Sequence, residues 1–454
     1  MIRSRGNGGI GALAVIVLAM LAFATAIIVW WHTRAVAAVG GPTVVVSGDT
    51  DGWISPGCTP KQSGGMARRA SYLAELREQG NLIYLDAGGA ASGISEYHKM
   101  KFEAIVEGER AMQIAAHNLG KSELALGPEY LRQIASRMHF PFVSENTRDT
   151  SGKRIIENRR IVESGGVRIG VIGVVSPLYG TEQIIVDDPR QAVVDATVAM
   201  KGHCNSLIVL AYMPEDELRR LAADLPQVDA IVGGAGEETI APKAVGATTL
   251  AAAGEYGKYL VEMRVPLGRS QGAWEGKMVE MTSAVADDAT QINNVQRYLS
   301  MLEARDFSAA ESGVGAAMPA AAGQSLAASA SCLKCHAGDY NAWIGSRHAR
   351  AFASLQETGF HVDSQCQKCH TSAFGMAGGF VSARRSGMSE LAGVGCESCH
   401  GPSAAHVKDP KKHTPWAAIV QCVRCHNEEN CPHFDYAASW EKIRHGNSSG
   451  VKKN

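Results

Sequence analysis

The pattern Cys-x-x-Cys-His occurs four times near the C-terminus, and it constrains this chain more than any other feature. The copies lie at residues 332–336, 366–370, 396–400 and 422–426, so they begin 34, 30 and 26 residues apart. At this spacing two thiols can form thioethers with a porphyrin, and the adjacent imidazole can ligate its iron from the proximal side. The pattern therefore predicts four covalently bound haems of the c type.

Each copy of the pattern supplies two attachment cysteines and one proximal histidine. Paired cysteines at this spacing can also bind zinc or form a disulfide, but neither role needs a histidine directly after the second cysteine. Residues 332–446 contain only 12 Val, Ile and Leu residues, too few for an ordinary core of that length, and porphyrins would supply the missing apolar surface. The predicted cofactor-binding residues are Cys332, Cys335, His336, Cys366, Cys369, His370, Cys396, Cys399, His400, Cys422, Cys425 and His426.

The overall composition is that of a globular protein. The chain has 454 residues, of which 45% are hydrophobic and 20% charged, which is enough for two or three domains. A net charge of −1 gives no reason to expect nucleic-acid binding. Eleven cysteines include the eight in the motifs, and Cys58, Cys204 and Cys431 remain. A Cys58–Cys204 disulfide and unpaired buried thiols are both compatible with the sequence.

The N-terminal residues predict export of the rest of the chain from the cytoplasm. Residues 1–9 include Arg3 and Arg5, and residues 10–31 form an uncharged apolar run of 22 residues, long enough to span a bilayer. The basic flank predicts that the N-terminus stays cytoplasmic and that the helix anchors the chain on the periplasmic side of the inner membrane. Ala35-Val36-Ala37 resembles a signal-peptidase site, so secretion to the periplasm after cleavage is the alternative.

Residues 42–283 alternate between two kinds of apolar pattern. Short runs rich in β-branched residues predict strands, and amphipathic stretches between them predict helices. The alternation favours an α/β domain with a buried mixed or parallel sheet. The predicted strands are 43–47, 82–86, 167–175, 206–211 and 230–233, and the predicted helices are 66–79, 101–119, 189–201 and 214–224.

Several segments of this region resemble the 5′-nucleotidase-like branch of the calcineurin-type metallophosphatases. Residues 47–53 (Ser-Gly-Asp-Thr-Asp-Gly-Trp), 64–70 and 85–89 (Leu-Asp-Ala-Gly-Gly) are similar to the opening of that family. Further matches follow in the same order at residues 119–127, 141–146, 166–176 and 228–234. The resemblance implies a layered αββα sandwich whose loops, in active relatives, hold two metal ions.

The positions that hold metal in those relatives are mostly changed. Asp-x-His is replaced by Asp49-Thr50-Asp51, Gly-Asp by Gly88-Gly89, and the Gly-Asn-His segment by Gly120-Lys121-Ser122. The later histidines are replaced as well, by Tyr212 and by the segment 234–237. A two-metal phosphoesterase needs bridging carboxylates and several imidazoles, so we expect this domain to be non-catalytic.

Other polar residues of the domain are weaker candidates for metal ligands. An oxygen-only cation site is conceivable, but solvated loop carboxylates are the commoner state of such residues. The histidines lack partners at metal-ligand spacing and are predicted to be surface or locally bonded. The carboxylates are Asp49, Asp51, Glu123 and Glu237, and the histidines are His98, His117, His139 and His203.

Residues 284–331 are predicted to connect two domains. Apolar positions at helical spacing predict a helix within 287–307, whereas 309–331 is dominated by Ala, Gly and Ser, which is typical of a flexible tether. The haem region is expected at 332–446, followed by a tail at 447–454, and relative motion of the two domains is expected.

The haem region also resembles the tetrahaem cytochrome c554 family. The resemblance lies in residues 340–351, in 393–403 (Gly-Val-Gly-Cys-Glu-Ser-Cys-His-Gly-Pro-Ser) and in 440–445. It implies a mostly helical, haem-cored electron carrier. It also implies that His348 and His406 are distal iron ligands, and position alone suggests His445 as the third.

The haem of the second motif, with His370 as proximal ligand, tends to lack a protein ligand on one face in that family. His361 and His413 are spare histidines that could fill this face, although a solvated loop position is expected for His413 and His433. Imidazole on both faces suits electron transfer, whereas an open face admits a small molecule.

These observations lead to two main functional hypotheses. The first is an exported tetrahaem cytochrome that relays electrons between donor and acceptor proteins, with the sandwich as a docking domain. The second is a haem enzyme acting on a small nitrogen or oxygen species. With both hypotheses in play, the sequence does not decide whether the chain is an enzyme. An active phosphoesterase is a weaker third hypothesis, because the metal-binding histidines are missing.

Overall fold

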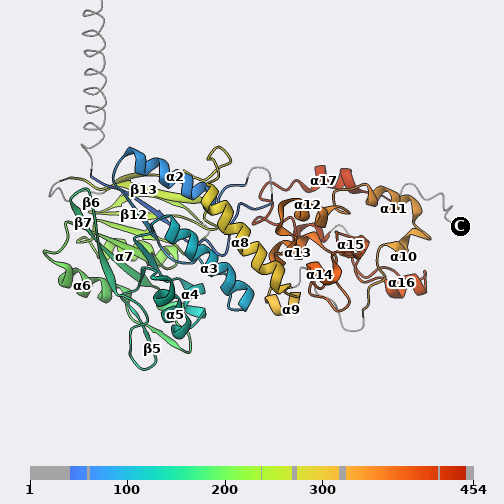
Figure 1. The fold of residues 1–454 in the computed structure, drawn as a ribbon, viewed down its shortest axis with the longest axis horizontal. Helices are drawn as coiled ribbons and strands as arrows, with labels where there is room; N and C mark the ends of the chain where they lie inside the picture. Colours follow the sequence, from blue (N-terminus) through green and yellow to red (C-terminus); the bar gives the residue numbers. More distant parts are fainter. Residues whose placement is uncertain are drawn as a thin grey trace, which may run out of the picture.

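A computed structural model describes residues 41–58, 62–236, 238–267, 274–315, 324–417 and 420–445. Two regions lie side by side along the longest axis, and the helix α8 (Ala289–Arg305) runs along the boundary between them (Figure 1). The predicted membrane helix at 10–31 and the tail at 447–454 lie outside these ranges. Among the helices within them, none is long and apolar enough to cross a bilayer.

The N-terminal region contains two six-stranded mixed sheets. The first has the order β14-β13-β1-β2-β3-β4, and the second has the order β11-β12-β10-β9-β7-β6. In the first sheet β1 to β4 are parallel, and in the second β7, β9, β10 and β12 are parallel. The strands of the first sheet are β1 (Thr43–Ser47), β2 (Leu82–Asp86), β3 (Ala116–Asn118), β4 (Phe142–Val143), β13 (Tyr259–Arg264) and β14 (Glu275–Glu280). Those of the second are β6 (Arg159–Ser164), β7 (Val167–Val175), β9 (Ser206–Tyr212), β10 (Ala230–Gly233), β11 (Ile240–Val245) and β12 (Thr248–Ala252). A separate pair is formed by β5 (Thr147–Asp149) and β8 (Ile184–Val186).

Alternation of side chains along the strands builds four layers. Val44 and Val46 of β1 point inward and share a core with Val171 of β7, whereas Val45 points outward to the helices. Ile172 of β7 likewise packs outward, against the other helices. The two sheets therefore pack face to face, with helices on both outer surfaces, which is the predicted αββα sandwich. The outer helices are α2 (Met66–Gln79), α3 (Glu96–Ala111) and α8 on the first sheet, and α6 (Pro189–Met200) and α7 (Glu215–Asp224) on the second.

One sequence prediction in this region is wrong. The apolar pattern predicts a helix over residues 101–119, but α3 begins after Ser95, whose side chain accepts a hydrogen bond from the amide of His98. The helix ends at Ala111, and Gln113 adopts a left-handed conformation with φ of 57°. Residues 116–118 then pair with β2 as the strand β3. Apolar spacing alone could not distinguish a helix from this helix-turn-strand sequence.

The C-terminal region consists of short helical segments without a described sheet. These are α10 (Ala330–Leu333), α11 (Ala337–Ile344), α12 (Ala351–Thr358), η2 (Phe360–Val362), α13 (Ser364–His370), α14 (Ala383–Ser386), α15 (Cys396–His400), α16 (Ala404–Lys408), η4 (Cys422–Arg424) and α17 (Tyr436–Ile443). The fold therefore combines a mixed α/β sandwich with a mostly helical region.

The two regions share one continuous apolar core. Phe352, Leu355 and Val362 of the helical region belong to the same buried cluster as Tyr298 and Leu302 of α8. Residues 309–315, which composition predicts to be a flexible tether, form a short helix α9 (Ala309–Ser312) and pack against α3. This described part of the predicted tether is thus packed against the fold, with Ala309, Ser312 and Val314 buried.

Candidate haem sites and the loops of the sandwich

Each Cys-x-x-Cys-His copy lies on a short helical turn. The first lies on α10 and the residues after it, the second on α13, the third on α15 and the fourth on η4. In the first and fourth copies the histidine amide donates to the carbonyl of the first cysteine, at 2.9 Å in both. A helical turn places residues three apart on one face, so both thiols of a copy can reach the same porphyrin edge.

Three proximal histidines each face a second imidazole. The ring centres are 6.2 Å apart for His336 and His406, 6.2 Å for His348 and His426, and 6.0 Å for His400 and His445. Two imidazoles bound to one metal ion through nitrogens about 2 Å from it would have ring centres about 6 Å apart. All three pairs therefore have the spacing that a shared iron requires, and the partners of the three proximal histidines, His406, His348 and His445, are the histidines predicted to be distal ligands.

The outer ring nitrogens are held in a way that suits metal ligation. Nδ1 of His370 lies 2.9 Å from the carbonyl of Ala351, Nδ1 of His406 lies 2.5 Å from that of Lys412, and Nδ1 of His445 lies 3.0 Å from that of Ile443. Because a carbonyl only accepts, Nδ1 donates in each case and Nε2 is left as the ligating atom. Burial lowers the pKa of His348 and His426, which favours the neutral imidazole that binds iron.

The thiols show which motifs are neighbours. Cys396 of the third motif raises the pKa of the Cys332 thiol of the first, and Cys425 of the fourth raises that of Cys369 of the second. Burial raises the pKa of Cys399 most and Cys422 raises it further, so the first and third, the second and fourth, and the third and fourth motifs are neighbours.

His370 differs from the other proximal histidines. Within the ranges that the structure describes, no second imidazole lies about 6 Å from the His370 ring, as one does for His336, His400 and His426. The ring of His361 instead packs edge-on against Phe352, with centres 6.1 Å apart. His413 and His433 are exposed, and no described ring contact joins either of them to His370.

The three cysteines outside the motifs are free thiols. Cys204 lies 3.7 Å from the carbonyl of Met200 and packs beside the core under α6. Cys58 has other neighbours. Burial raises the pKa of its thiol most, and Cys369 and Cys431 raise it further, which shows that both lie near it. The structure thus places Cys58 beside the haem region, away from the Cys204 partner that the sequence allowed.

In the sandwich, the loops that hold metal in active relatives are packed together directly. The Tyr212 hydroxyl lies 3.0 Å from Oδ1 of Asp49. A Cβ atom added at Gly89, where relatives have aspartate, would lie 2.3 Å from that same oxygen and 2.6 Å from the Tyr212 ring. Tyr212 therefore fills the space that a ligand at position 89 would need.

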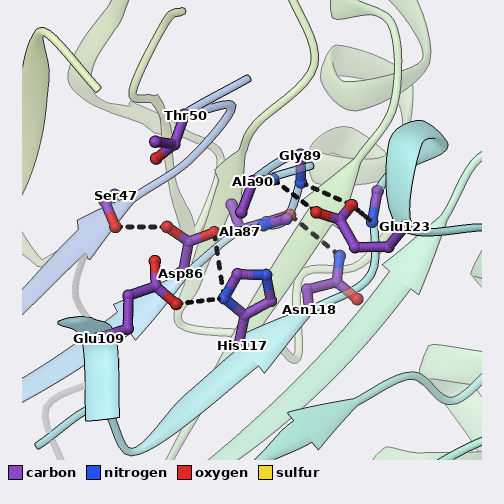
Figure 2. Close-up of polar contacts among 12 residues, drawn as sticks. Ser47, Thr50, Asp86, Ala87, Gly89, Ala90, Glu109, His117, Asn118 and Glu123 are labelled. Atoms are coloured by element: carbon purple, nitrogen blue, oxygen red, sulfur yellow. Dashed lines mark hydrogen bonds and ion pairs between the residues drawn. The ribbon is translucent and has the colours of Figure 1, made fainter. Parts of the chain in front are cut away.

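Glu123 is used by the backbone. Its carboxylate accepts hydrogen bonds from the amides of Gly89, Ala90, Ala91 and Gly120, at 2.5–3.0 Å (Figure 2). The side chain is completely buried, so its oxygens bind the loop and are not available to a cation from solvent. Asp51 is exposed, and Glu237 lies outside the described residues. Of the described carboxylates in this set, Glu123 is thus bound by backbone amides and Asp49 by the Tyr212 hydroxyl.

A buried polar cluster that the sequence did not reveal lies next to these loops (Figure 2). His117 is fully buried, with Nδ1 2.7 Å from Glu109 and 3.7 Å from Asp86 (Figure 2). These three side chains could in principle hold a metal ion. However, the Arg69 guanidinium lies 3.6 Å from Glu109 and already supplies positive charge. The residues lie at positions 69, 86, 109 and 117, and only the folding of α2, α3 and two strands brings them together.

The charge state of His117 supports an ion-pair network. Burial alone would lower its pKa, but the carboxylates of Glu109 and Asp86 outweigh burial and raise the pKa to about 9. Two cations, Arg69 and His117, therefore balance two carboxylates in the interior. The other sandwich histidines have simpler surroundings: His98 bonds to Ser95, while His139 and His203 are exposed.

Comparisons with known proteins agree with this division of the chain. Residues 331–401, which include the first three motifs, match the family model for cytochrome c554 and c-prime. Cytochrome c-554 of Nitrosomonas europaea is 34% identical over 111 residues, or 20% of this chain and 46% of that protein. The C-terminal region is similar to cytochrome c554. This similarity implies covalently bound haem c and redox partner proteins.

The sandwich is similar to 5′-nucleotidases. The snake venom 5′-nucleotidase of Crotalus adamanteus is 27% identical over 189 residues, covering 38% of this chain and 31% of that protein. The structure of a 5′-nucleotidase precursor from Thermus thermophilus aligns with a TM-score of 0.53 and 24% identity, covering 58% of this chain and 59% of the other. The structural similarity shows a metallophosphatase-like fold. The chain spans less than half of either curated relative, so neither match by itself describes the whole protein.

The first prediction concerns the ion-pair network. Replacing Arg69 by Met leaves two buried carboxylates with a single cation, which should cost about 3–5 kcal/mol of stability. Urea unfolding followed by circular dichroism measures the change. Arg110→Met is the matched control, because Arg110 is half-exposed and pairs with Glu107 on its own helix. Equal losses in both variants would contradict the network.

The second prediction concerns Asp49. Burial raises the pKa of its carboxyl from 3.8 to about 8, against the opposing hydrogen bond from Tyr212. The folded protein then binds the proton more tightly than the unfolded chain, so stability should fall as pH rises from about 4 to 8. Asp49→Asn should flatten this part of the profile in unfolding measurements. The decline caused by His117, between pH 6.5 and 9, should persist in the variant.

Proposed function

We propose that this chain is an exported tetrahaem c-type cytochrome that relays electrons, and that its sandwich serves as a non-catalytic scaffold and docking domain. The observation that carries the proposal is the set of three imidazole pairs with ring centres 6.0–6.2 Å apart. An iron with imidazole on both faces stays low-spin and changes little between its two redox states, which favours electron transfer.

In this proposal each motif holds one haem through its two cysteines. Three of the irons would be held by His336 with His406, by His426 with His348, and by His400 with His445. The haems supply the reversible one-electron chemistry, and this chain's residues orient them, exclude water and set their potentials. The mutual effects of thiols from the first and third, the second and fourth, and the third and fourth motifs on their pKa values support a compact group of haems.

A second candidate function rests on His370. Its Nδ1 is fixed by the Ala351 carbonyl, and among the described residues no histidine faces its ring as in the other three pairs. A haem held there would have one face open to a small ligand. This favours binding or reduction of a small nitrogen or oxygen species at the second motif, as an activity added to electron relay.

The sandwich is proposed to be catalytically inactive because its pocket is filled. Tyr212 occupies the space beside Asp49, and four backbone amides occupy the carboxylate of Glu123. The positions that relatives use for two metals are therefore unable to hold them without rearrangement of both loops.

The distal assignment is tested by removing one imidazole at a time. His406→Ala should convert one haem from low-spin to high-spin, and added imidazole should restore the original spectrum. His413→Ala is the control, since that side chain is exposed. Mass spectrometry of the untreated protein should show four haems on the chain. An unchanged low-spin spectrum in His406→Ala would overturn the assignment, and a colourless protein would overturn the function.

The inactive sandwich is tested with nucleotide esters and added Mn²⁺ or Zn²⁺. The purified chain should show no metal-dependent hydrolysis above the buffer rate, and Asp49→Asn should leave that result unchanged. Hydrolysis that requires metal and disappears in Asp49→Asn would show that the pocket can open and bind ions.

A further inference from the structure

The second haem motif is attached to the sandwich through a buried polar cluster. Asp363 precedes α13, the helix that carries Cys366, Cys369 and His370, and its carboxylate accepts a hydrogen bond from the amide of Gln365 at 2.9 Å. Only 2% of Asp363 is exposed. This carboxylate thus fixes the start of the helix while lying inside the interface between the two regions.

The side chains that bind the Asp363 carboxylate come from the sandwich side. Lys101 of α3 forms an ion pair with it, with Nζ 3.2 Å from Oδ2. The hydroxyl of Tyr298 on α8 donates to the same oxygen at 3.2 Å, and the hydroxyl of Tyr97 on α3 donates to Oδ1. Lys101 also donates to the Tyr97 hydroxyl at 2.7 Å. Tyr97 and Tyr298 are at most 1% exposed and Lys101 is 6% exposed, so solvent screens none of these contacts appreciably.

The cluster is electrically close to the haem attachment site. Burial raises the pKa of the Cys366 thiol most, Asp363 raises it further, and Lys101 lowers it. Both charges therefore act on the position where the second haem would be attached. By contrast, the first, third and fourth motifs have no comparable cluster from the sandwich among the described contacts.

We propose that the sandwich positions and tunes the second haem, with Lys101, Tyr97 and Tyr298 acting as positioning residues through Asp363. This inference rests on the proposed function, because it assumes a haem at the second motif. It gives the metallophosphatase-like fold an intramolecular role: α3 and α8 form a rigid polar socket for one redox centre. The haem in that socket is also the one with an open face.

The charges make opposite predictions for two single substitutions. Lys101→Met leaves the Asp363 carboxylate uncompensated, which disfavours adding an electron nearby, so the reduction potential of the second haem should fall. Asp363→Asn leaves Lys101 uncompensated, so the potential should rise. We expect each change to alter the equilibrium constant for reduction about tenfold, which is about 59 mV for one electron. A double variant should return close to the wild-type potential.

The test is a spectroelectrochemical titration of the full haem-loaded chain. The second haem is followed through its high-spin signal, and the other three through their low-spin bands, which should shift much less. Lys99→Met is the matched control, because Lys99 lies on the same helix and contacts the Tyr130 ring, away from Asp363. If Asp363→Asn fails to fold, Tyr298→Phe replaces it in the test. This variant keeps the packing and should shift the reduction potential of the second haem by a smaller amount.

The outcomes separate this inference from the proposed function. Shifts of opposite sign confined to the second haem support the socket. No shift, shifts of the same sign in both single variants, or equal shifts of all four haems would overturn it while leaving the cytochrome intact. A wild-type chain without haem at the second motif would overturn the proposed function itself, and the mass of the purified protein reveals this before any titration.

Discussion

The spacing between paired imidazoles is the constraint on which the C-terminal region depends. Three pairs have ring centres 6.0–6.2 Å apart, a gap that an iron with two nitrogen ligands would fill. The surrounding chain is a series of short helices and turns with few aliphatic residues, so its own side chains could not form a large core. In this view the cofactors are the core, and the polypeptide supplies the ligands and the carbonyls that orient them.

Under the proposed function, the sandwich keeps the architecture of a metallophosphatase-like fold without its metal site. Its two sheets and outer helices pack as in metallophosphatase-like structures, because that packing depends on alternating apolar residues in the strands. The loops above the sheets depend on different contacts. Glu123 bridges two of them through backbone amides, and Tyr212 with Asp49 closes the space between them. These interactions stabilise the loops without metal, so the fold can persist as a scaffold.

Under the proposed function, the contact between the two regions lets the sandwich hold the haem region in one position. Their shared apolar core and the buried Lys101–Asp363 pair argue against the independent motion that composition suggests. A buried ion pair is only weak evidence for stability, but it specifies one arrangement because misplacing either charge is costly. A fixed arrangement matters for electron transfer and for ligand access at one haem, both of which depend on the placement of α13 relative to its surroundings.

The chemistry of the haem motifs and part of the periodic structure can be recognised without knowing the fold. The four haem motifs and five of the fourteen described strands could be identified from local patterns. The loss of metal-binding histidines and the distal roles of His348 and His406 follow from resemblance to known families, and that of His445 from its position. Only the tertiary structure decided which imidazole faces which, since His348 and His426 lie 78 residues apart in sequence. It also revealed the Arg69–Glu109–His117–Asp86 network and the Asp363 socket, and it replaced one long predicted helix by α3 and β3. Local sequence encodes backbone preference and covalent spacing, whereas charge pairing and burial depend on contacts between residues that are distant in the chain.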